Sequence, residues 1–143
     1  GLKLRVRRSG GRVHSDSLLL ARIVGNLVSN AIKYTERGSV LLAVRHVASR
    51  PCIEIWDTGV GIAPEHQRDI FREFYKVPAH AGTEDGFGLG LYIVARLSHI
   101  LDHPVELSSR PGKGTVFRLT LKPADPQQAA ARAASYDQLA RRP

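Results

Sequence analysis

The chain has 143 residues, a formal net charge of +8, 43% hydrophobic residues and a single cysteine. This length predicts one domain, whose hydrophobic content suffices for a core without a disulfide or metal staple. An internal disulfide is excluded, and no apolar run reaches the roughly 20 residues that cross a bilayer. We therefore expect a soluble, cytoplasmic domain, although a longer parent protein could be anchored in the inner membrane. The charge favours an anionic partner, either nucleic acid or nucleotide phosphate.

The first third of the chain predicts a strand followed by a long helix. Residues 2–7 alternate apolar and basic, which indicates a half-buried strand with a basic solvent face, and residues 13–14 are a short further piece. Asp16 is a typical helix N-cap. Apolar residues then recur every three or four positions to about Thr35, and Gly38 is the expected stop.

Asn26 and Asn30 lie in register on this helix, four residues apart, and Lys33 and Tyr34 follow one turn later. Asparagine is a mediocre helix former, so two in one row need a reason. A plain solvent face is the alternative, but this row borders the apolar stripe and does not oppose it.

Residues 39–47 and 52–56 predict an antiparallel hairpin that turns at residues 50–51. The second strand ends in Asp57, which is followed by Gly59 and Gly61. An ionised Asp only accepts hydrogen bonds, so it suits an amine-bearing ligand, and glycines let the chain turn and a ligand lie against the backbone. An ordinary strand-to-loop turn is the competing interpretation.

The next segment predicts a short helix from Ile62, with Pro64 near its start and Ile70, Phe71 and Phe74 on its apolar side. Residues 75–87 show no periodicity, which is typical of a lid or a disordered loop.

A glycine-rich run over residues 86–91 leads into an apolar helix over residues 92–101, and such helix starts suit phosphate because their free N–H groups point outward. Residues 104–109 and 115–121 predict a second hairpin. Two hairpins exclude an all-parallel sheet and favour an α+β two-layer sandwich covered on one face by about three helices. The domain should span residues 1–122, with residues 123–143 as a linker or an appended helix.

Familiar phosphate and metal motifs fail on spacing. The run 112–115 lacks the P-loop glycine five places before its Gly-Lys pair, and Gly86, Gly88 and Gly90 do not have dinucleotide-binding spacing. His99 and His103 are four apart, but no third ligand is evident, so we expect both to be surface residues.

Five segments together resemble the conserved boxes of the catalytic, ATP-binding domain of sensor histidine kinases, within the GHKL superfamily. Residues 26–35 resemble the N box, 57–64 the G1 box, 71–76 the F box, 86–91 the G2 box and 112–117 the final glycine turn. They occur in the family's order, and the resemblance runs from about residue 1 to 121. It implies a mixed, mostly antiparallel sheet under three helices.

The resemblance also implies a site for ATP and Mg²⁺. Asp57 would accept a hydrogen bond from the adenine amino group, with Thr115 assisting, while Gly59 and Gly61 leave room for the ring. Asn30 would ligate Mg²⁺ through its amide oxygen. The remaining implied ATP-binding residues are Asn26, Lys33, Tyr34, Ile62, Lys76, Gly86, Phe87, Gly88, Leu89, Gly90 and Leu91, with Asn26, Asn30 and Lys33 also catalytic.

One departure from the superfamily is informative. Its hydrolytic members carry a glutamate base where this chain has Asn26, which cannot take a proton, so the site favours transfer over hydrolysis. The residues after the six histidines are Ser15, Val47, Gln67, Ala81, Ile100 and Pro104, and none is the acid that follows a phosphoacceptor histidine.

The resemblance therefore implies an enzyme module that acts on a separate helical dimerisation and phosphoacceptor domain, with a response-regulator receiver domain downstream. The isolated fragment should be monomeric and should not phosphorylate itself. A non-catalytic nucleotide-binding regulatory module remains the alternative. A nucleic-acid-binding domain is disfavoured because the basic residues lack interleaved aromatics.

Overall fold

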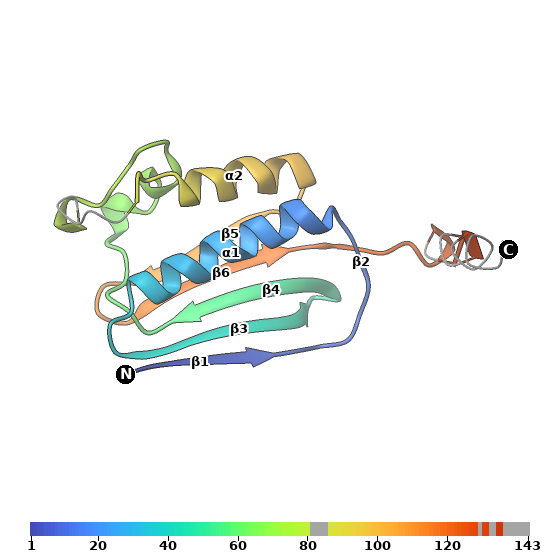
Figure 1. The fold of residues 1–143 in the computed structure, drawn as a ribbon, viewed down its shortest axis with the longest axis horizontal. Coiled ribbons are helices and arrows are strands. Elements are labelled where there is room, and N and C mark those ends of the chain that lie inside the picture. Colours follow the sequence, from blue (N-terminus) through green and yellow to red (C-terminus); the bar gives the residue numbers. More distant parts are fainter. Residues whose placement is uncertain (81–85, 129, 132–133, 136–143) are drawn as a thin grey trace, which may run out of the picture.

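The computed structural model describes residues 1–80, 86–128, 130–131 and 134–135. Figure 1 shows a sheet with a layer of helices over one face. The strand order is β1-β3-β4-β6-β5, in which β1 pairs with β3 in parallel and the other neighbours pair antiparallel. The mixed, mostly antiparallel α+β sandwich is thus confirmed. The bounds are β1 Leu2–Arg7, β3 Gly38–Val47, β4 Arg50–Asp57, β5 Val105–Arg110 and β6 Gly114–Thr120.

The helix layer consists of α1 (Ser17–Lys33) and α2 (Gly90–Leu101), which contact each other. The Asp16 side chain accepts a hydrogen bond from the Leu19 N–H at 2.9 Å, so the predicted N-cap is confirmed. The helix α1 ends with Tyr34 as its C-cap, and Gly38 begins β3 instead of closing the helix.

A continuous core joins the two layers. On α1 the buried residues are Ile23, Leu27 and Ala31, four apart and therefore on one face. They join buried side chains of β3, β4, β6 and α2, namely Val40, Ile53, Ile55, Phe117, Leu119 and Val94. Because successive strand residues face opposite sides, Asp57 shares the helix-covered face of β4 with Ile53 and Ile55.

Two strand predictions need correction. Leu4 and Val6 of β1 are each 55% exposed, so β1 is not half-buried. It is an edge strand, and α1 contacts β3 and β4. The β3–β4 hairpin turns at Ala48 and Ser49, both with positive φ, while residues 50–51 belong to β4.

The predicted short helix is instead a pair of 3₁₀ turns, η1 (Pro64–His66) and η2 (Asp69–Phe71). Neither has a side-chain cap, and a third turn, η3 (Pro78–His80), follows in the predicted lid. Ile70 is buried as predicted, but Phe74 is exposed and has φ +60°, so it does not join the apolar side. The lid prediction falls partly on residues 81–85, outside the described chain.

A two-stranded sheet pairs β2 (Val13–His14) with β7 (Lys122–Pro123). This pairing reaches residue 123, one place past the expected domain boundary, and residues 129, 132–133 and 136–143 of the tail lie outside the described residues. His103 is fully buried, and its Nε2 lies 2.8 Å from Ser15 Oγ, so the surface prediction is wrong for this residue. The chain reverses at Asp102, in the left-handed region, which turns His103 inward. No helix in the described part of the chain is long and apolar enough to span a membrane.

Candidate nucleotide-binding site

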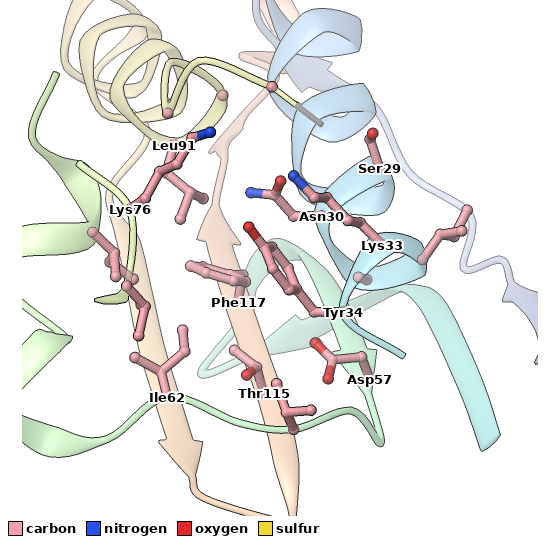
Figure 2. Close-up of a pocket in the computed structure, with 18 of the residues that line it drawn as sticks. Ser29, Asn30, Lys33, Tyr34, Asp57, Ile62, Lys76, Leu91, Thr115 and Phe117 are labelled. Carbon is pink, nitrogen blue, oxygen red and sulfur yellow. The ribbon is translucent and has the colours of Figure 1, made fainter. Parts of the chain in front are cut away.

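A cavity of about 640 Å³ lies between the helices and the sheet, within the range of small-molecule sites. Figure 2 shows Asp57, Thr115 and Ile62 at one end, and Lys76 and Leu91 at the other. Asn30, Lys33 and Tyr34 enter from α1. The structure therefore brings the acid of β4 and the amide of α1 to one cavity, as the sequence predicted.

Asp57 is held at the cavity end by backbone donors. Its Oδ1 accepts the Gly59 N–H at 2.9 Å, and the backbone of Thr115, its partner in the β4–β6 ladder, also stabilises the carboxylate by a hydrogen bond. Burial raises the pKa of Asp57, and these two hydrogen bonds oppose that shift. A carboxylate has about four acceptor sites, so capacity remains for a donor from the cavity.

The glycines after Asp57 are required by the protein backbone itself. A Cβ at Gly59 would lie 2.2 Å from the Tyr34 carbonyl oxygen, and a Cβ at Gly61, which has φ +72°, would lie 2.1 Å from the Arg110 carbonyl oxygen. The expectation that both leave room for a ring is therefore incomplete. Their first role is to let this loop pack against the end of α1 and the β5–β6 turn.

The helix α2 opens onto the cavity without a side-chain N-cap. The first N–H groups of such a helix have no partner within it, and together with the helix dipole they favour an anion. A Cβ at Gly90 would lie 3.3 Å from Asn26 Oδ1 and 3.9 Å from Asn30 Nδ2, so both asparagines lie beside this helix start. The Lys33 ammonium lies 3.7 Å from the Cβ position of Gly86 and 5.3 Å from the centre of the Tyr34 ring.

Most of the predicted binding residues line the cavity, from five separate segments of the chain. They are Asn30, Lys33, Tyr34, Asp57, Gly61, Ile62, Lys76, Gly86, Phe87, Gly88, Gly90, Leu91 and Thr115. Asn26, Gly59 and Leu89 do not line it: Asn26 lies one turn earlier and donates to the Arg22 carbonyl at 3.0 Å, while Gly59 packs against Tyr34 and Leu89 is the residue before α2.

Sequence reasoning missed much of the wall. Ser29, Val60, Ile70, Tyr75, Val77 and Phe117 also line the cavity. Tyr75 is positioned by His66, whose Nδ1 lies 2.7 Å from the Tyr75 hydroxyl oxygen. Phe117 belongs to the segment matched to the final glycine turn, and as a strand residue two places after Thr115 it lies on the same face.

Comparison with known proteins identifies the class. Residues 15–125 match the family of histidine kinase-, DNA gyrase B- and HSP90-like ATPases, and the chain belongs to this family. Its fold is that of histidine kinase catalytic domains. It superposes on full-length ShkA in complex with AMPPNP with a TM-score of 0.74 and 32% identity, covering 87% of this chain and 26% of ShkA. Superposition on the mycobacterial sensor histidine kinase MprB has a TM-score of 0.71 and 25% identity, covering 86% of this chain and 84% of that structure.

The similar curated proteins are sensor histidine kinases. The chain is 39% identical over 112 residues to the sensor-like histidine kinase SenX3 of Mycobacterium tuberculosis, covering 77% of this chain and 27% of SenX3. It is 34% identical over 110 residues to the sensor histidine kinase RcsC of Escherichia coli, covering 76% of this chain and 12% of RcsC. The chain thus spans about a quarter or less of these relatives.

Proposed function

We propose that this domain binds ATP with Mg²⁺ and transfers the γ-phosphoryl group to a histidine on a separate helical dimerisation and phosphoacceptor domain. The observation that supports it most is that Asp57, Asn30 and the glycine-rich start of α2 line one cavity. Asp57 accepts hydrogen bonds and so suits the adenine amino group, while the start of α2 favours an anion and so suits the phosphates.

Each end has its own chemistry. At the sheet end, Asp57 accepts a hydrogen bond from the adenine amino group, which guanine replaces with a carbonyl acceptor. At the helix end, the free N–H groups of α2 and the ammonium groups of Lys33 and Lys76 stabilise phosphate charge. Tyr34 lies between them in Figure 2, at the edge expected for the sugar.

Asn30 fits a magnesium site. Its amide oxygen is a hard ligand at the cavity wall beside the start of α2, where phosphate oxygens would supply further hard ligands. In the described residues no cluster of three or more His, Cys, Asp or Glu could hold a metal by itself, so a shared protein–phosphate site is the form that suits this chain. When bound, Mg²⁺ would neutralise phosphate charge during transfer.

The side chains favour transfer over hydrolysis. Asn26 occupies the position of the hydrolytic glutamate, and its amide, which donates to the Arg22 carbonyl, cannot accept a proton from water. In the transfer, a ring nitrogen of the partner histidine bonds to the γ-phosphorus, the bond to the β–γ bridging oxygen breaks, and ADP leaves. The phosphoryl group would then pass to a response-regulator receiver domain.

The test combines the purified domain with γ-labelled ATP, Mg²⁺ and a separately purified phosphoacceptor domain of a sensor histidine kinase. We expect acid-labile label on that domain, no label on this chain alone, and no transfer to an acceptor whose histidine is replaced by alanine. Binding of ATP without transfer to any of a panel of such acceptors would contradict the enzyme role and indicate a regulatory module.

A further inference from the structure

Ser109, at the end of β5, makes three hydrogen-bond contacts beside the Asp57 end of the cavity. Its hydroxyl oxygen accepts the Ile62 N–H at 2.8 Å. It lies 3.0 Å from the Gly114 carbonyl oxygen and 2.9 Å from Thr115 Oγ1. Ile62 and Thr115 line the cavity, whereas Ser109 does not.

Only one arrangement of protons satisfies all three contacts. A serine hydroxyl has one hydrogen and two lone pairs. The Gly114 carbonyl can only accept, so the serine hydrogen must go there, and the Ile62 N–H occupies one lone pair. The Thr115 hydroxyl must then donate its hydrogen to the second lone pair of Ser109. The Thr115 oxygen is left with lone pairs alone to offer.

A second contact pair keeps this network in place. Gln67 Nε2 donates to the Ile62 carbonyl at 3.0 Å and to the Ser109 carbonyl at 3.2 Å. This amide ties the loop after Gly61 to the end of β5, so that the Ile62 N–H stays directed at the Ser109 hydroxyl.

The consequence for the cavity is a pair of acceptors at one end. Thr115 and Asp57 are partners in the ladder, and Figure 2 shows their side chains next to each other. An exocyclic amino group has two N–H donors to match two acceptors, whereas a carbonyl oxygen offers only lone pairs. A freely rotating threonine hydroxyl could donate to that carbonyl, but a hydroxyl whose hydrogen is held elsewhere cannot.

We propose that Ser109 is a positioning residue that holds the Thr115 hydroxyl as an acceptor, so that this end of the cavity selects a 6-amino purine over a 6-oxo purine. This inference rests on the proposed nucleotide-binding function. Ser109 acts through Thr115 and does not itself touch the nucleotide.

The test measures dissociation constants of ATP and ITP, the 6-oxo analogue, for wild type and Ser109→Ala by calorimetry with Mg²⁺. In the variant the Thr115 hydroxyl can turn, so we expect the ATP-over-ITP preference to fall roughly three- to tenfold, the range of one neutral hydrogen bond. The matched control is Ser108→Ala, one residue earlier on the exposed face of β5, which should keep the wild-type ratio.

If Ser109 served folding alone, the variant would bind ATP and ITP more weakly by the same factor. An unchanged ratio of the two dissociation constants would overturn the inference. Should Ser109→Ala not fold, Ser109→Cys replaces the hydroxyl with a weakly hydrogen-bonding thiol, and we expect the same fall in the ATP-over-ITP preference. Failure of the proposed function is a separate result, because wild type would then bind neither nucleotide.

Discussion

Two carboxylates on β4, three residues apart and on opposite faces of the sheet, have opposite surroundings. Glu54 is 1% exposed and is contacted by Arg118 Nε at 2.7 Å, Arg45 Nε at 2.9 Å and Trp56 Nε1 at 3.0 Å. Asp57, on the helix-covered face, accepts backbone N–H groups from Gly59 and Thr115 and borders the cavity.

The pKa shifts of the two groups show what this difference does. Burial is the largest single influence on each carboxyl group, and taken alone it would raise both pKa values. At Glu54 the hydrogen bonds from Arg118, Trp56 and Arg45 outweigh burial, and the pKa is lowered. At Asp57 the two backbone hydrogen bonds do not, and the pKa is raised. A buried carboxylate paired by side chains supports structure, whereas one held by backbone with capacity to spare is suited to a ligand.

The largest expected effect comes from a change at Asp57, the carboxylate that faces the cavity. Asp57→Asn places a donor where the adenine amino group needs an acceptor, so we expect ATP affinity to fall about 100-fold, or about 2.8 kcal/mol. Calorimetry with Mg²⁺ measures it, and circular dichroism should show an intact fold. The control is Asp69→Asn, a partly exposed residue outside the cavity lining. Unchanged affinity for ATP would remove Asp57 from the adenine role.

Removing Glu54 should instead lower the stability of the fold and leave ATP affinity unchanged. Glu54→Ala leaves two guanidinium groups and an indole without their acceptor, and because Arg45 and Arg118 are 52% and 32% exposed we expect a loss of about 2 kcal/mol in the free energy of unfolding. Urea titration measures it. Glu106→Ala, whose 66% exposed carboxylate lies 3.7 Å from Arg118, should cost under about 0.5 kcal/mol. If the folded Glu54 variant lost ATP affinity, the separation of the two roles would be wrong.

A smaller effect is expected at the phosphate end of the cavity. Asn30→Ala removes the proposed magnesium ligand, so ATP affinity in the presence of Mg²⁺ should fall about tenfold, or about 1.4 kcal/mol. Binding without metal should change less. Ser29→Ala on the same helix, also at the cavity, is the matched control. Equal wild-type affinities with and without Mg²⁺ would contradict the role of Asn30.

The smallest expected effect is on pH dependence. The raised folded-state pKa of Asp57 means that its ionisation opposes folding, so its contribution weakens the fold as pH rises above 3.8, its ordinary value. Because the pKa of Glu54 is lowered, its ionised carboxylate stabilises the fold above pH 4.5. That stability is lost as pH falls through the folded-state pKa. Relative to wild type, Asp57→Asn should therefore gain stability as pH rises above 3.8, whereas Glu54→Gln should lose stability relative to wild type as pH rises toward 4.5 and change little above it. Urea unfolding across these pH values measures both slopes, and slopes of equal sign would refute the contrast.

The local elements were predictable because their signals are short-range. The Asp16 cap, the apolar row of α1 and the alternating strands depend on residues within a few positions, and the structure confirms each. The errors in predicted burial came from long-range packing. The exposure of Leu4 and the burial of His103 depend on which element covers the strand edge and on where the chain turns after α2.

The site shows the same division. Asp57, Asn30 and the glycines before α2 were identified from motifs, because side-chain chemistry at an element's end can be recognised in sequence. The positions of Phe117 and Val77 in the wall, and the packing of Gly59 against Tyr34, depend on contacts between distant segments. Motif spacing holds no information on those contacts.

The sequence alone determined which residues carry hydrogen-bonding groups and which helices and strands present them, since both follow from local chemistry and periodicity. Only the tertiary structure decided which of those groups already have a partner. Glu54 and Asp57 are both acids within one strand, and the sequence does not say which side chains surround either of them. Their surroundings come from β3, β6 and the loop after β4, and it is this assembly that satisfies one acid with side chains and leaves the other facing a cavity.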